Sequence, residues 1–194
     1  MKRLLPLISL VGLNCAASAA LVVSIDISDP SAAVVTGLPA GSSSTGNLTV
    51  NFNGGISFRN FFTSDESITL ADPLPISGDW RPAGTSTSYN ETVTFVYGDP
   101  DVVPGVDLSI YNSGAGAGDL QTFATGERAF FGSSVIDLSS FSALPEVGTT
   151  GDVMIGFQSS QGGMIGQWIV IPEPASLSLA ALGGGMLLLR RRRG

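Results

Sequence analysis

Between Leu21 and Ile171, no long stretch of the sequence shows the apolar period of an amphipathic helix. Short runs rich in β-branched and aromatic residues dominate instead, and clusters of Gly, Ser, Pro, Asn and Asp separate them. In the run LVVSIDIS, the apolar residues Val23, Ile25 and Ile27 alternate with polar ones, which is typical of a strand with one buried face. This pattern predicts an all-β body.

The other strand-like runs are short and follow one another with regular turn signals; they are NLTVNF, ISFRNFF, ETVTFVY, VDLSIY, ERAFFGSSVIDL, DVMIGFQS and GQWIVI. The NGG at 53–55 predicts a hairpin turn between the first two of these runs. About eight to ten strands of this kind predict one antiparallel, jelly-roll-like β-sandwich over 20–170. Three Gly- and Ser-rich stretches, at 40–45, 78–89 and 112–118, are predicted to be surface loops.

The N-terminal sequence MKRLLPLISLVGLNCAASAA has the layout of a secretory signal peptide, with two basic residues, an apolar run and then small residues. Its last residues place cleavage after Ala19 or one residue later, so the signal peptide is 1–19 and its partners are the Sec translocon and signal peptidase. A buried N-terminal helix is the alternative. Cys15 raises a lipoprotein alternative, which the residues before it fit poorly. The mature chain then has no cysteine and no disulfide.

The C-terminal end combines an apolar stretch with a basic cluster. As a helix, 175–189 is about 22 Å long, against a hydrocarbon core of about 30 Å, which makes it a marginal transmembrane span. The basic residues that follow are Arg190, Arg191, Arg192 and Arg193; such clusters stay cytoplasmic, so the body is expected outside. Just before the span, Pro172 and Pro174 flank Glu173, which ends any strand and favours an extended, exposed segment.

With a signal peptide at the other end, residues 171–194 resemble the PEP-CTERM sorting signal, in which a PEP tripeptide, a short apolar helix and an arginine cluster occur in this order. The resemblance implies that an exosortase is the partner of this tail. Pro172, Glu173 and Pro174 would be its recognition motif, and Arg190 to Arg193 the topological stop. It further implies a transient stay in the inner membrane, removal of the tail, and transfer of the body to the cell surface or extracellular matrix. An ordinary C-terminal anchor is the alternative.

Charge and composition exclude several function classes. The stretch from 21 to 171 holds three basic and fifteen acidic residues, a net charge of −12, which argues against nucleic-acid binding. The chain has no histidine and no mature cysteine, so serine–histidine relays, thiolate nucleophiles and imidazole metal sites are excluded. We therefore predict no catalytic residue, no metal site and no cofactor. A pair of carboxylates acting on a glycan stays an alternative.

Two groups of side chains are candidates for ligand contacts. Trp80, between Asp79 and Arg81, can form a platform on which a sugar stacks; the alternative is a core plug. Asp99 and Asp101 can form a weak extracellular calcium site, or they are solvated turn residues. The first hypothesis is therefore a non-enzymatic structural or adhesive protein of the envelope or exopolysaccharide. A carbohydrate-binding module and a glycan-active enzyme are the alternatives.

Overall fold

The computed structural model describes residues 19–63, 73–95, 106–116, 118–141, 143–156 and 162–172. This part of the chain is all-β apart from one short 3-10 turn, η1 (Pro30–Ala32), which confirms the predicted class. Nine strands form one closed barrel; they are β1 (Leu21–Asp26), β2 (Ala33–Gly37), β4 (Ile56–Phe62), β5 (Leu74–Gly78), β7 (Glu91–Phe95), β8 (Val106–Tyr111), β11 (Ser133–Ile136), β12 (Thr150–Ile155) and β13 (Met164–Ile171).

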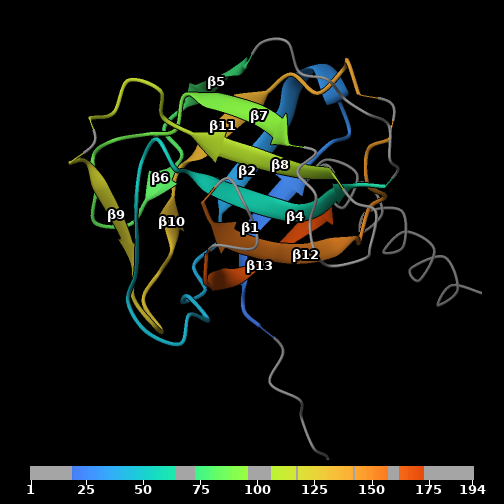
Figure 1. Cartoon of the computed structure of the whole chain (residues 1–194). Helices are drawn as coiled ribbons and strands as arrows, with labels where there is room; N and C mark the ends of the chain where they lie inside the picture. Colours follow the sequence, from blue (N-terminus) through green and yellow to red (C-terminus); the bar gives the residue numbers. More distant parts are fainter. Residues whose placement is uncertain are drawn as a thin grey trace, which may run out of the picture.

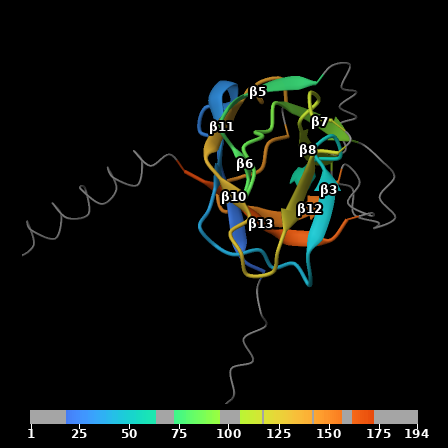
Figure 2. The same cartoon turned by 90° about the vertical axis from the view of Figure 1, so that its left-hand side faces the viewer.

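The strands follow the order β1-β13-β12-β4-β8-β7-β5-β11-β2 around the barrel, and β2 pairs with β1 to complete it. Figure 2 shows these strands surrounding a common interior. Two small ribbons lie at one end of the barrel (Figure 1). They pair β3 (Leu48–Asn51) with β9 (Leu120–Phe123), and β6 (Arg81–Pro82) with β10 (Phe130–Phe131).

The first and last strands of the barrel are neighbours. β1 pairs with β13 in parallel, with Val23 opposite Trp168 and Asp26 opposite Ile171. Every other pair in the barrel is antiparallel. Because β13 also pairs with β12, the last strand of the body joins its two sides. The barrel is therefore complete only when residues 164–171 are in place.

Two expectations about strand pairing were wrong. The strands form one closed sheet rather than two sheets packed face to face, and β3 does not pair with β4 across the turn at 53–55. β3 pairs with β9, while β4 lies between β8 and β12. The alternation of apolar residues reports which face of a strand is buried, but it carries no information about which strand lies beside it.

Aromatic side chains fill the interior. Trp168 is fully buried, as its place in an alternating strand predicts, and its ring lies 5.4 Å from that of Phe61. Phe58 lies 6.4 Å from Phe61 and 5.9 Å from Trp80, measured between ring centroids. The two tryptophans are thus joined by one continuous set of ring contacts, and rings in such contacts stabilise a core beyond the area they bury.

Two of the three predicted surface loops are not loose. Ser42 and Ser44, in the stretch 40–45, are only 3% and 2% exposed. The stretch 78–89 contains β6 and contributes two buried rings, those of Trp80 and Tyr89. In 112–118, the described residues are half-buried or exposed, as expected of a surface loop. The serines of 40–45 led to a wrong prediction of a loose loop. They can be buried because the hydroxyl groups of Ser42 and Ser44 donate hydrogen bonds to backbone carbonyls.

Candidate functional site

Trp80, the central residue of the predicted ligand platform, belongs to the core. Its side chain is 0% exposed, and its ring lies 4.9 Å from that of Tyr89 and 5.0 Å from that of Phe130. The indole therefore offers no face to a ligand, and the core-plug alternative describes it correctly. Its Nε1–H has no hydrogen-bond acceptor among the described residues.

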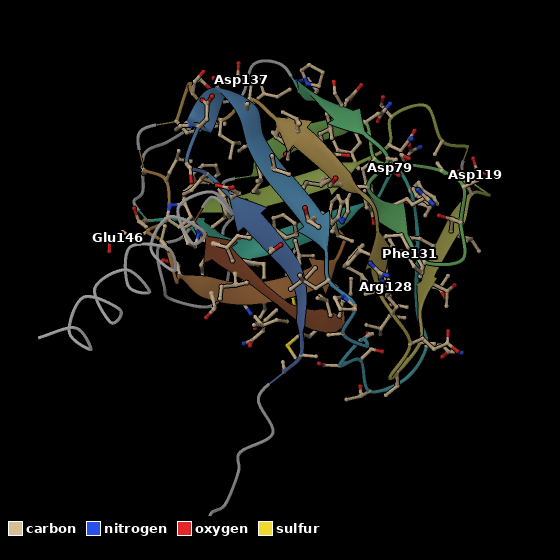
Figure 3. The ribbon with its side chains drawn as sticks, turned by 180° about the vertical axis from the view of Figure 1, so that it is seen from behind. Asp79, Asp119, Arg128, Phe131, Asp137 and Glu146 are labelled. Carbon is tan, nitrogen blue, oxygen red and sulfur yellow. The ribbon has the colours of Figure 1, made fainter. Side chains whose placement is uncertain are left out.

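Asp79 and Arg81, the neighbours of Trp80, lie at the surface. They lie beside Phe131, an aromatic residue that was not predicted from the sequence to be part of the site. Across the β6–β10 ribbon, Arg81 pairs with Phe131 and Pro82 with Phe130. Since side chains alternate along a strand, Phe130 is buried while Phe131 is 38% exposed. Figure 3 shows Asp79, Phe131 and Arg128 close together at this end of the molecule. We call Asp79, Arg81, Arg128 and Phe131 the ribbon patch.

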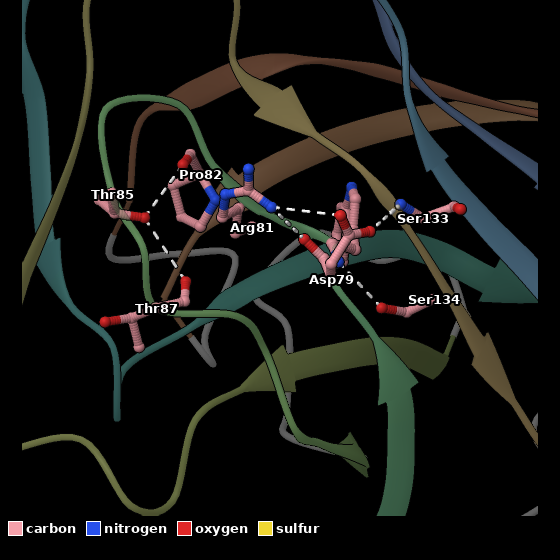
Figure 4. Close-up of polar contacts among 8 residues, drawn as sticks. Asp79, Arg81, Pro82, Thr85, Thr87, Ser133 and Ser134 are labelled. Atoms are coloured by element: carbon pink, nitrogen blue, oxygen red, sulfur yellow. Dashed lines mark hydrogen bonds and ion pairs between the residues drawn. The ribbon is translucent and has the colours of Figure 1, made fainter.

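Asp79 is held in place by several hydrogen bonds (Figure 4). The Ser133 backbone N–H donates to Asp79 Oδ1 at 3.0 Å, and Arg81 Nη1 lies 3.3 Å from Asp79 Oδ2. The Ser133 N–H holds the pKa of the Asp79 carboxyl below its usual value, and the Arg81 guanidinium adds to this effect. Gly132, with a φ of +74°, allows this approach, because a Cβ there would lie 2.4 Å from Asp79 Oδ1.

Arg128 is also fixed by the fold. Its Nε donates to the Phe130 carbonyl at 2.8 Å, and its Nη2 donates to the Gly37 carbonyl at 3.1 Å. These bonds place its Cζ 4.1 Å from the centroid of the Phe131 ring, in a cation–π contact. The patch therefore combines a partly exposed ring with one carboxylate and two guanidinium groups, all with restrained positions.

The ribbon patch offers charged hydrogen-bonding groups beside an aromatic ring. Among the described residues, no three His, Cys, Asp or Glu side chains lie close enough together to hold a metal ion. Asp99 and Asp101, the calcium candidates, lie outside the described residues. An ionised carboxylate and guanidinium groups beside a ring can bind hydroxyl groups and one apolar face of a sugar.

A buried polar contact near the patch was also missed. The Tyr89 hydroxyl donates to Gln121 Oε1, and Gln121 Nε2 donates to the Gly55 carbonyl at 3.3 Å. Burial raises the pKa of the Tyr89 phenol well above its usual value, so the hydroxyl stays protonated and able to donate. This contact attaches β9 to the end of the barrel and has a structural role.

The two predicted processing sites adjoin the barrel. Ala19 is half-buried just before β1, and Pro172 is half-buried directly after β13. Because β1 and β13 run in parallel, these residues lie at opposite ends of the same pair of strands. Glu173, Pro174 and the arginines from 190 to 193 lie outside the described residues.

The described segments include no helix long and apolar enough to cross a membrane, and the predicted span at 175–189 is not among them. In comparisons with known proteins, no family model matches the chain, and no curated protein or solved structure shows significant similarity to it.

Proposed function

We propose that this protein is an exported, non-enzymatic structural or adhesive component of the cell envelope or extracellular polymer, sorted by an exosortase through residues 171–194. The observation that carries the proposal is where the motif begins. Ile171 is the last residue of β13, the last strand that the structure describes, and Pro172 follows it directly. A cut beyond Pro172 therefore removes the tail without removing any residue of the barrel wall.

The short connection also determines where the body lies before release. Four residue steps separate Ile171 from Ala175, where the expected span begins, and an extended chain covers at most about 14 Å over that length. While the tail is in the membrane, the end of β13 is therefore held close to the bilayer surface, where a membrane enzyme can reach the motif.

Intact-mass analysis of the protein from its host tests the sorting proposal. We expect the surface form to end between Pro172 and Pro174, and the form from a host lacking the exosortase to include Arg193 and to stay with the membrane. Replacing Pro172 and Pro174 by alanine should cause the same retention. A matched control replaces Ser113, which is exposed, by alanine. Surface protein that keeps Arg193 in the normal host would contradict the proposal.

The ribbon patch favours carbohydrate binding as a second candidate function. An exposed phenyl ring, a restrained carboxylate and two guanidinium groups lie together on an acidic body with few basic residues. Such a patch can hold an exopolysaccharide and so retain the protein in the matrix. No observation on the described residues favours glycan hydrolysis, which needs two carboxyl groups on either side of the scissile bond.

Retention of the purified protein on host exopolysaccharide tests the second candidate. Phe131→Ala removes the exposed ring. We expect this substitution to weaken retention by about two- to fivefold, because an exposed cation–π contact contributes about 0.5–1 kcal/mol to binding. Val147→Ala is the matched control, since Val147 is 60% exposed and lies outside the patch. Equal retention of the two variants would show that the patch does not bind the polymer.

A further inference from the structure

The backbone around the predicted signal-peptide cleavage bond is part of the folded structure. The Ala20 N–H donates to Ser43 Oγ at 2.7 Å, and the Ala20 carbonyl accepts from the Gln167 N–H at 2.8 Å. Ala19 and Ala20 are both half-buried. The residue just after the bond is thus held from one side by the 40–45 stretch and from the other by β13.

The serines of the 40–45 stretch connect this segment to the beginning of β13. Ser42 Oγ donates to the Ile165 carbonyl at 2.9 Å, and the Ser43 N–H donates to the same oxygen at 2.7 Å. Ser42 is buried, so water competes little for these bonds. We call Ser42 and Ser43 the serine clamp, because they hold Ala20 through Ser43 and β13 through Ile165.

Close packing leaves no room beside this backbone. At Gly166 a Cβ would lie 2.8 Å from the Ala20 carbonyl oxygen and 2.7 Å from Val22 Cγ1. Real Cβ atoms do not approach other atoms so closely, so even a methyl group there displaces the N-terminal segment. An enzyme that binds its substrate as an extended strand uses the same main-chain groups that Ser43 and Gln167 already occupy.

We infer that the closed barrel protects the Ala19–Ala20 bond, so signal peptidase must cut before β13 docks. This inference rests on the proposed export of the chain. In the cut, water breaks the peptide C–N bond: the hydroxyl goes to the Ala19 carbonyl carbon, which becomes a carboxylic acid group, and the other proton of the water goes to the Ala20 nitrogen, which becomes an amine. Because β13 is the last strand of the body, the bond is open to the enzyme until residues 164–171 arrive.

The docking of β13 therefore ends access to the N-terminal bond. Before it, the N-terminal bond is accessible and the barrel is open. After it, Ala20 is held by the serine clamp, and Pro172 lies at the opposite end of the completed wall. Hydrolysis at the N-terminus precedes barrel closure, whereas removal of the tail takes away no strand and leaves the closed barrel intact.

The test uses the full-length precursor, folded and purified in non-ionic detergent, with two proteases. One is signal peptidase, and the other is elastase, which also cuts after alanine. We compare the unsubstituted precursor with Gly166→Ala, which displaces Ala20, and Ser43→Ala, which removes the acceptor for its N–H. Gly46→Ala is the matched control, because a Cβ at Gly46 meets no atom within 4 Å. Intact mass measures the cut, and tryptophan fluorescence verifies that each variant is folded.

Both proteases should cut the unsubstituted precursor and Gly46→Ala slowly and at equal rates. Ser43→Ala should be cut about fivefold faster, the effect of one lost hydrogen bond, and Gly166→Ala at least about tenfold faster, because cleavage follows local opening. Equal cleavage of all four folded forms at this bond would overturn the inference. Protection from elastase, together with no cut by signal peptidase in any form, would instead overturn the proposed signal peptide.

Discussion

A chain that ends at Gly163 is expected to lose cooperative folding, whereas a chain that ends at Pro172 is expected to keep it. The shorter chain lacks β13, so β1 and β12 each lose a hydrogen-bonded partner and become open edges. It also lacks three buried side chains, Ile165, Trp168 and Val170. Their loss costs about 1.5–3 kcal/mol for each aliphatic side chain and about 3–5 kcal/mol for the tryptophan, together about 6–11 kcal/mol, which is comparable to the typical total stability of about 5–15 kcal/mol.

Thermal denaturation followed by near-UV circular dichroism measures this difference. Both truncated chains lack residues 173–194, so the comparison isolates the contribution of β13. The chain ending at Pro172 should melt in one transition, like the full-length protein, and the chain ending at Gly163 should show no transition. If the shorter chain melted cooperatively, β13 would not close the barrel, and the proposed protection of the Ala19–Ala20 bond by the closed barrel would lose its basis.

Trp80→Ala is expected to lower the free energy of unfolding by about 3–5 kcal/mol, the usual cost of removing a large aromatic side chain from a core. The ring of Trp80 contacts those of Phe58, Tyr89 and Phe130, and nothing replaces these contacts. Trp80→Phe should cost clearly less. It keeps an aromatic ring in the core and removes a buried N–H for which the described residues offer no acceptor.

Urea denaturation of Trp80→Ala, Trp80→Phe and Phe131→Ala measures these effects. Phe131→Ala is the surface control from the same ribbon, and we expect it to change the free energy of unfolding by less than about 1 kcal/mol. The two aromatic residues would then have separate roles, Trp80 in stability and Phe131 in retention on the polymer. If Trp80→Ala were as stable as the unsubstituted protein but were retained less on the exopolysaccharide, Trp80 would be a ligand contact and not a core residue.

The ribbon patch shows how far a sequence can lead towards a candidate site. Asp79 and Arg81 were identified from their place beside a tryptophan, and they do lie at the surface. The aromatic partner was misassigned, because Trp80 is inside and Phe131 is outside. One residue separates an inward from an outward side chain in a strand, and β6 and β10 are only two residues long, too short to show an alternation.

The hydrogen bonds that hold Ala20, beside the proposed cleavage bond, could not be predicted from the sequence for a different reason. Small residues before Ala20 indicate where a signal peptidase cuts, and this depends only on neighbours in the chain. The hydroxyl that holds Ala20 comes from Ser43, and the wall beside it comes from Gly166, far along the sequence. A Gly/Ser-rich stretch is predicted to be a flexible loop unless the hydrogen-bond partners of its serines are known.

By itself, the sequence determined the all-β class and the burial of Trp168, because these follow from periods and propensities within single strands. The single buried face predicted for β1 was wrong, since Val22 and Ser24 are buried as well as Val23 and Ile25. Only the tertiary structure decided that β1 and β13 run side by side and that nine strands close into one barrel. It also decided that Trp80 lies in the core and Phe131 at the surface. The physical reason is that strand pairing joins backbone groups far apart in the chain, and backbone hydrogen bonds are the same for every residue type except proline.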